Sequence, residues 1–236
     1  MNSFNLSAGK RQELDEIGFA IISGPVPAVD LPQLTAAYDA AVTSAPSDDV
    51  RVGSSTTRVS DLFNRGLEFD RLYVHPPVLK ACCHIMGEPF RLSTMLARTL
   101  RPNLPAQNLH VDFARDTHGW TMVGFIFMVD EFRSDNGATR FVPGSHYRSD
   151  TPQKRVGDLK ADYPGQILAC GPAGSMIVFN GSIWHGHGAN RSDEPRRSIQ
   201  GAYIRRDEES GENLRARMLP ETLTRINPLA KYVLAV

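Results

Sequence analysis

Four side chains with the types and spacing of a metal site lie in two distant parts of the sequence. His110 and Asp112 are separated by one residue, so in an extended segment both side chains point to the same face. Two further imidazoles, His185 and His187, follow much later. Two His and one carboxylate form a facial triad with three adjacent open coordination positions, which is typical of non-haem iron(II) oxygenases. An isolated His-x-Asp pair would more simply be two surface residues on a turn, so the hypothesis depends on the later histidines.

An arginine follows the second pair of histidines. Arg196 lies eleven residues after His185, beyond a polar turn at residues 192–195. This spacing lets the chain leave one strand, turn, and return on a neighbouring strand beside the metal. Arg98, on a strand predicted to precede the metal segment, either faces the pocket and pairs with an anion or is a surface residue.

The other candidate residues favour structural roles. His146 more simply makes hydrogen bonds within a turn than acts in catalysis, and His118 is expected in an exposed loop. Residues 46–60 are polar and predict a loop, which is a candidate lid over the substrate site. The three cysteines form no C-x-x-C pair and no even disulfide framework, so they indicate free thiols.

A β-rich core must position these residues. From about residue 91, short β-rich runs alternate with Gly, Pro and Asn turn signals, which indicates an antiparallel sandwich or barrel. Helical patterns come before and after this region, and Pro228 interrupts the last of them. We therefore expect one domain over residues 1–236, with an N-terminal helical layer to about residue 90, a β core over about 91–206 and a C-terminal helical tail. The predicted helices are at residues 8–17, 31–42, 77–86 and 220–236, and the predicted strands at residues 19–22, 91–100, 120–129, 138–142, 166–169, 175–179 and 198–204.

Composition argues against several kinds of partner. Lys and Arg together number 26, as do Asp and Glu, so no global field attracts nucleic acid or an anionic membrane. The sequence has no run of about 18 apolar residues and no apolar signal-peptide core near its start. These features predict a cytoplasmic protein that acts on a small molecule, with neither nucleic acid nor membrane as a partner.

A series of short motifs runs along nearly the whole chain, at residues 13–21, 110–112, 136–140, 142–146, 174–179 and 184–186, together with Asn190 and Arg196. Their order and spacing resemble the phytanoyl-CoA dioxygenase family of iron(II)- and 2-oxoglutarate-dependent oxygenases. The resemblance implies a mainly β fold with flanking helices, the double-stranded β-helix or cupin-like jelly roll.

The resemblance also implies roles for individual residues. His110, Asp112 and His185 match the metal ligands, and Arg196 matches the arginine that binds the distal carboxylate of 2-oxoglutarate. The family commonly has a serine where this chain has His187, so this histidine is a co-substrate contact, a substrate contact or an alternative ligand.

The implied cofactors are Fe(II), 2-oxoglutarate as co-substrate and O2. The implied reaction is hydroxylation of an unactivated C–H bond of a small metabolite, with release of succinate and CO2. Asp112 favours hydroxylation, or a desaturation or cyclisation variant, over halogenation, which needs a small residue at this position. Two alternatives remain open at this point: a cupin-type metal enzyme that does not use 2-oxoglutarate and would not need Arg196, and a catalytically silent binding protein of the same fold.

Overall fold

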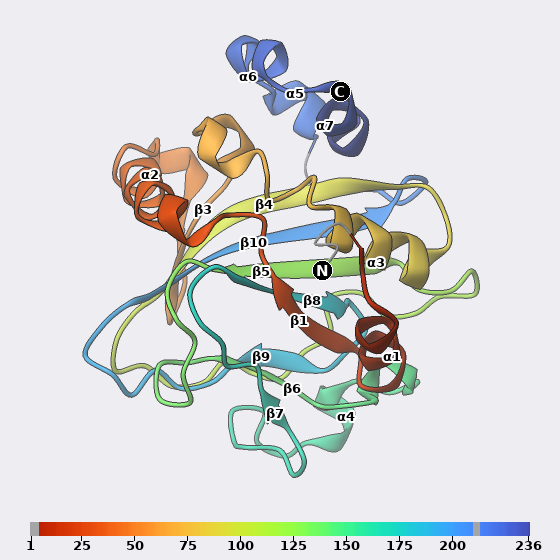
Figure 1. Cartoon of the computed structure of the whole chain (residues 1–236). Helices are drawn as coiled ribbons and strands as arrows, with labels where there is room; N and C mark the ends of the chain where they lie inside the picture. Colours follow the sequence, from red (N-terminus) through yellow and green to blue (C-terminus); the bar gives the residue numbers. More distant parts are fainter. Residues whose placement is uncertain (1–4, 210–212) are drawn as a thin grey trace.

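Two antiparallel β-sheets pack against each other, and helices cover the outer face of the larger sheet (Figure 1). The computed structural model describes residues 5–209 and 213–236. The larger sheet has seven strands in the order β1-β8-β5-β10-β4-β3-β2, and the smaller has three in the order β7-β6-β9. The strands are β1 (Phe19–Ser23), β2 (Val50–Val52), β3 (Thr56–Val59), β4 (Phe90–Leu100), β5 (Met122–Met128), β6 (Thr139–Phe141), β7 (Ile167–Leu168), β8 (Ser175–Asn180), β9 (His185–His187) and β10 (Arg196–Arg205).

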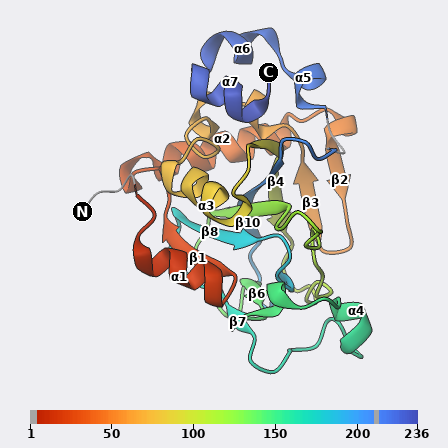
Figure 2. The same cartoon turned by 90° about the vertical axis from the view of Figure 1, so that its right-hand side faces the viewer.

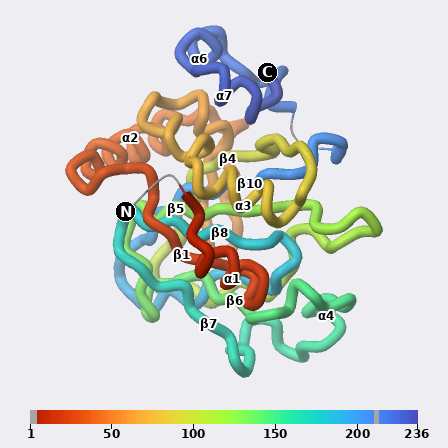
Figure 3. The backbone as a smooth tube through the Cα atoms, turned by 45° about the vertical axis from the view of Figure 1, so that its right-hand side comes forward, coloured from red at the N-terminus to blue at the C-terminus, as the bar shows by residue number. Residues whose placement is uncertain are grey.

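The helices lie where apolar residues recur at helical spacing. Ser7 caps the first helix, because its hydroxyl accepts a hydrogen bond from the backbone N–H of Lys10. The last three helices lie beyond α2 and α3, far from the small sheet (Figure 3). The helices are α1 (Ala8–Glu16), α2 (Leu31–Thr43), α3 (Pro76–Met86), α4 (Pro152–Arg155), α5 (Leu214–Arg217), α6 (Pro220–Arg225) and α7 (Pro228–Leu234).

The two faces of the large sheet contact different partners. On the outer face, alternate residues such as Phe125, Phe127 and Ile199 belong to one buried apolar cluster with residues of α2, α3 and α7. On the inner face, Ile126 and Phe179 belong to a second cluster, which the small sheet completes. The alternation of strand side chains thus separates a helical layer from the interior of the sandwich.

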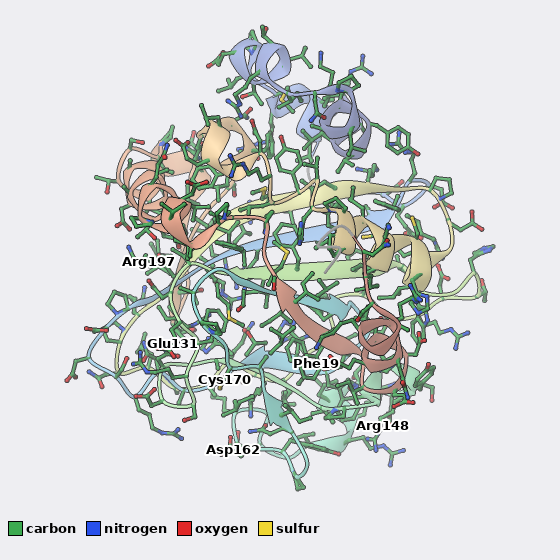
Figure 4. All side chains as sticks on the ribbon, in the orientation of Figure 1. Phe19, Glu131, Arg148, Asp162, Cys170 and Arg197 are labelled. Atoms are coloured by element: carbon green, nitrogen blue, oxygen red, sulfur yellow. The ribbon has the colours of Figure 1, made fainter. Side chains whose placement is uncertain are left out.

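The stacked rings of Phe19 and Phe141 join the two sheets. Phe19, labelled in Figure 4, begins β1, and Phe141 ends β6. Their ring centroids lie 4.4 Å apart. Phe141 also lies beside His185, at 5.7 Å between ring centroids. Aromatic packing therefore fixes the small sheet at the place where one predicted metal ligand is found.

Most predicted elements are confirmed, and one expectation needs correction. Within residues 1–90, β1 matches the strand predicted at residues 19–22, whereas β2 and β3 were not predicted and join the same large sheet. Residues 46–60 were expected to be a loop, yet they contain the β2–β3 hairpin, which lies at the edge of the sheet beside β4 (Figure 2). Val50, Val52 and Val59 flank a Gly-Ser-Ser turn there, which is a hairpin pattern. In the part of the chain that is described, no helix has the length and apolar character that crossing a bilayer requires.

Candidate metal centre

His110 and His185 face each other across a backbone bridge between two distant parts of the chain. The N–H of each residue donates to the carbonyl oxygen of the other, and both N–O distances are 3.0 Å. The two imidazole ring centroids are 4.4 Å apart. The paired backbones therefore hold the two side chains on the same side of the bridge.

Asp112 completes the group without forming the strand that its spacing predicts. Only His110 pairs as a β-bridge, and the backbone N–H groups of Asp112 and Phe113 both donate to the carbonyl oxygen of Gly181, at 3.1 and 3.2 Å. The Asp112 carboxylate oxygens nevertheless lie 3.4 Å from Nε2 of His110 and 3.4 Å from Nε2 of His185. The ligand atoms of the three residues all lie within 4.8 Å of one another.

The arrangement of protons at the two imidazoles suits a cation. Nδ1 of His110 lies 3.0 Å from the carbonyl oxygen of Asn108, and Nδ1 of His185 lies 3.0 Å from that of Ile183. A proton on each Nδ1 satisfies these carbonyls and leaves a lone pair on each Nε2. Two lone pairs and a carboxylate then converge on one point, which is the donor set that a divalent metal requires.

The charges of the three residues are coupled. Burial raises the pKa of the Asp112 carboxyl, but His185 and His110 outweigh this effect and hold that pKa well below its usual value. Burial lowers the pKa of His185, whereas the Asp112 carboxylate raises it, and the net shift is upward. Asp112 is thus an anion at neutral pH, as a metal ligand must be.

Gly186 lets the metal segment approach β9 closely. A Cβ atom at this position would lie 3.0 Å from the carbonyl oxygen of Asn108 and 3.3 Å from that of Gln107. Both contacts are with backbone, which cannot rotate away. The glycine between His185 and His187 is therefore needed for the spacing between the two segments that carry the candidate ligands.

The three residues line one cavity of about 450 Å³ inside the sandwich. Its lining includes three arginines, Arg58, Arg98 and Arg196, and Asp112 is its only carboxylate among the described residues. Every residue that the sequence singled out as ligand or cofactor contact lies on this cavity. The cavity therefore combines a cation site with an excess of guanidinium groups.

Arg196 is buried at the start of β10 with donors that have no partner. Its residue is 1% exposed, and its guanidinium carbon lies 3.9 Å from the ring centroid of Phe132. Nε and Nη1 are buried and make no hydrogen bond to any described residue. Burial lowers the pKa of Arg196 to about 10, so it is still a cation at neutral pH. A buried guanidinium with free donors suits an anion that the protein itself does not supply.

The neighbouring Arg197 fixes the end of β10 from the opposite face. Its guanidinium pairs with Asp130 at 2.7 Å and with Asp39 of α2 at 2.8 Å, beside the helical layer (Figure 4). Side chains alternate along a strand, so these ion pairs turn Arg196 toward the cavity. The two adjacent arginines thus have separate roles, one in positioning the strand and one in the cavity.

Arg98 and Gln107 form a polar group beside the triad. Nη2 of Arg98 donates to Oε1 of Gln107 at 2.9 Å, and Nη1 donates to Oε1 of Gln200 at 3.1 Å. Burial lowers the pKa of Arg98 to about 9, with Arg58 and Arg196 adding to the shift. Sequence reasoning missed Gln107, although it stands three residues before His110 and so belongs to the same segment.

Arg140 ties the segment of Gln107 to the small sheet. This fully buried side chain donates to the carbonyl oxygens of Gln107 and Leu159, both at 2.7 Å, and to that of Ala161. One guanidinium thus connects β6 to two loops. The sequence motif at residues 136–140 therefore has a positioning role at this site.

His187 lies on the cavity but outside the triad. Its Nδ1 lies 2.8 Å from the carbonyl oxygen of Gly188, and its Nε2 lies 2.9 Å from the hydroxyl of Ser55 in the β2–β3 turn. Burial, together with Arg98 and Arg196, lowers the pKa of His187 to about 3, so its imidazole is neutral. With both nitrogens hydrogen-bonded, His187 is less suited than His185 to bind a metal.

The remaining histidines weighed in the sequence lie elsewhere. His146 is buried under α1, with Nε2 3.1 Å from the carbonyl oxygen of Asp15, as its expected structural role requires. His118 is exposed in the turn between Asp116 and Gly119. Neither lines the cavity of the triad.

Known proteins resemble this chain in sequence. The model of the phytanoyl-CoA dioxygenase family matches residues 14–198. Dioxygenase cdmA of Talaromyces verruculosus is 39% identical over 108 residues, which are 42% of this chain and 35% of that protein. Dioxygenase aneA of Aspergillus aculeatus is 29% identical over 174 residues, covering 66% of this chain and 57% of that protein. The chain thus spans less than two thirds of the length of these curated relatives.

Solved structures share the fold. HygX from Streptomyces hygroscopicus, crystallised with nickel and 2-oxoglutarate, superimposes with a TM-score of 0.72 at 16% identity, over 88% of this chain and 90% of that one. The epimerase SnoN, in complex with Fe3+, alpha ketoglutarate and nogalamycin RO, gives 0.68 at 22% identity, over 93% and 91%. These likenesses confirm the predicted jelly roll. From the family match over most of its length, the chain belongs to the phytanoyl-CoA dioxygenase family of iron(II)- and 2-oxoglutarate-dependent oxygenases.

Proposed function

We propose that this protein is a dioxygenase that uses Fe(II), 2-oxoglutarate and O2 to hydroxylate an unactivated C–H bond of a small metabolite. Succinate and CO2 would be the co-products. One observation carries the proposal: a two-His-one-carboxylate group and a buried guanidinium with free donors line the same cavity. A metal site alone would not need Arg196, which supports the oxygenase over a cupin-type enzyme without 2-oxoglutarate.

In this proposal His110, Asp112 and His185 hold the metal on one face and leave its other positions open. When bound, the iron supplies the oxygen and electron-transfer chemistry that no side chain of the chain can perform. The Nδ1 hydrogen bonds fix both imidazoles with Nε2 toward the metal. The protein thus contributes the ligand geometry and the cavity that surrounds it.

Arg196 would hold the far carboxylate of 2-oxoglutarate, and charge supports this assignment. A divalent metal with Asp112 has a net charge of +1, dianionic 2-oxoglutarate changes this to −1, and Arg196 restores neutrality. Burying a neutral set avoids the desolvation cost of an unpaired charge. Arg98 and its partner Gln107 are proposed contacts to the metal-bound end of the co-substrate, and neutral His187 a further contact at the cavity wall.

Succinate release tests the proposal. The protein is loaded with Fe(II) and 2-oxoglutarate without oxygen, then exposed to O2 with a panel of candidate metabolites. We expect succinate to form in the same amount as a product that, by its mass, has gained one oxygen atom. His185→Ala should abolish both signals, and His118→Ala, which alters an exposed histidine, should leave them unchanged.

The same assay separates the competing functions. Turnover without 2-oxoglutarate that survives Arg196→Leu would indicate the cupin-type enzyme, and absence of turnover with intact substrate binding would indicate a silent binding protein. A product that has lost two hydrogens, or that has changed only its stereochemistry, would leave the oxygenase assignment intact but would show that the reaction is not hydroxylation. The structural neighbours named an epimerase and a carbocyclase make this product analysis necessary.

A further inference from the structure

Three arginines lie side by side across three neighbouring strands at the cavity. In the β2–β3 hairpin Arg51 is the register partner of Arg58, and between β3 and β4 Arg58 is the partner of Arg98. Direct partners in antiparallel strands point to the same face, with Cβ atoms about 4.5–5.5 Å apart. We call these three residues the arginine row.

The arginine row runs from solvent into the cavity. Arg51 is exposed, Arg58 is half-buried and lines the cavity, and Arg98 is 8% exposed and lines it beside the triad. Strands β2, β3 and β4 carry the row along one side of the molecule (Figure 2). The row therefore leads from the protein surface toward the candidate metal centre.

Nothing in the described chain neutralises the outer two members. The guanidinium groups of Arg51 and Arg58 have neither a hydrogen bond nor an ion pair with any described residue. Arg98 donates only to the neutral amide oxygens of Gln107 and Gln200. Like charges in direct register destabilise a sheet. An anion bound beside the row would offset the repulsion among these three guanidinium groups.

We propose that the arginine row binds an anionic group of the substrate, a carboxylate or a phosphate, chiefly through Arg58, while Arg98 at the inner end of the row also faces the co-substrate. This inference rests on the proposed function, because there the metal, Asp112, 2-oxoglutarate and Arg196 already sum to zero. Arg58 and Arg98 then leave the loaded cavity with a surplus of two positive charges. A neutral substrate would leave this surplus without a counter-charge, whereas an anionic one offsets it through charge-assisted hydrogen bonds.

Three probes with one methyl group each test the proposal: methylphosphonate, acetate and the neutral acetamide. Each is titrated into protein loaded with diamagnetic Zn(II) and 2-oxoglutarate, and the methyl signal is followed by 1H NMR. We expect saturable binding of an anion and none of acetamide. Tighter binding of methylphosphonate would identify the substrate group as a phosphate, and tighter binding of acetate would identify it as a carboxylate. In either case the binding must weaken when Arg58 is replaced.

Variants locate the binding. Arg58→Gln should weaken anion binding about tenfold or more, since it removes a charge-assisted contact, while Arg58→Lys should retain part of the affinity. Arg51→Gln should have a smaller effect, because this side chain is exposed. Arg215→Gln removes the same charge from an exposed position on α5 and should change nothing.

Two results would overturn the inference: no saturable anion binding to the wild-type protein, or equal weakening by Arg58→Gln and Arg215→Gln. Binding of 2-oxoglutarate to the Zn(II)-loaded wild-type protein is measured first by calorimetry. Absence of that binding would refute the proposed function, whereas 2-oxoglutarate binding without anion binding would refute only the role of the arginine row.

Discussion

Replacing Arg196 by leucine should change co-substrate affinity and protein stability in opposite directions. The side chain is 1% exposed, and two of its nitrogens have no partner. In the protein without co-substrate, Arg196→Leu removes a buried charge that lies over the Phe132 ring. The lost cation–π contact is worth about 0.5–2 kcal/mol, whereas an unpaired buried charge costs several kcal/mol. We therefore expect the variant to unfold at the same or a higher temperature.

Affinity for 2-oxoglutarate should fall steeply in the same variant. Removing one partner of a buried, hydrogen-bonded charge pair costs about 2–5 kcal/mol, and every 1.4 kcal/mol corresponds to about a tenfold change in Kd. Two free donors place the expected loss near the middle of this range, about 3–4 kcal/mol, so Kd should rise by about 10²- to 10³-fold. Calorimetric titration of 2-oxoglutarate into Zn(II)-loaded protein measures this change.

Arg197→Leu is the matched control. It breaks the ion pairs with Asp130 and Asp39 outside the cavity, so it should lower the unfolding temperature with a much smaller change in Kd. A Kd for Arg196→Leu within threefold of the wild-type value would refute the role of this arginine. So would a clear loss of stability in the metal-free variant, because it would mean that the chain itself satisfies the guanidinium.

Three further predictions concern the surroundings of the site. Gly186→Ala should weaken metal binding about tenfold or more, because the new Cβ would lie 3.0 Å from the carbonyl oxygen of Asn108. Competition with a chelating dye measures the metal affinity, and an unchanged affinity would contradict the argument from close approach. Arg140→Met should lower both the unfolding temperature and the affinity for 2-oxoglutarate, since it leaves the Gln107 carbonyl without the donor that lies 2.7 Å away. Thermal melts and 2-oxoglutarate titrations measure the two quantities, and no change in either would contradict the prediction. Burial lowers the pKa of His75, so the stability contributed by its neutral form is complete above the unfolded pKa of about 6.5 and is lost as pH falls below that value. Denaturant melts across this range should show that the free energy of unfolding of His75→Gln falls less steeply with decreasing pH than that of the wild type. Equal slopes would exclude the effect.

The candidate metal ligands could be named from the sequence because residue type, order and spacing indicate the chemistry of such a site. His110, Asp112 and His185 were proposed from one short motif, a distant histidine, the spacing to Arg196 and the family resemblance, and the structure brings the three side chains together. The reasoning behind Asp112 was nevertheless incomplete, because residue 112 is held by the Gly181 carbonyl and not by a strand. The spacing placed the side chains on one side, although the backbone reaches that geometry differently.

The arginine row could not be predicted because it depends on strand register. Arg51, Arg58 and Arg98 are neighbours only once the β2–β3 hairpin joins the edge of the sheet. A polar segment with three valines gives a weak strand signal, and it becomes a hairpin because β4 provides the backbone partners. Long-range pairing of this kind cannot be derived from local sequence patterns.

β2 is the last strand of the seven-stranded sheet, so among the described residues one side of its backbone has no neighbouring strand. An open edge of this kind invites a strand of another molecule to pair with it, which is a route to aggregation. β2 has three residues, and its central residue is Arg51, whose charge would oppose the same charge on an approaching copy. This arginine therefore also protects solubility, and an apolar replacement beside the exposed Val52 would favour edge-to-edge association.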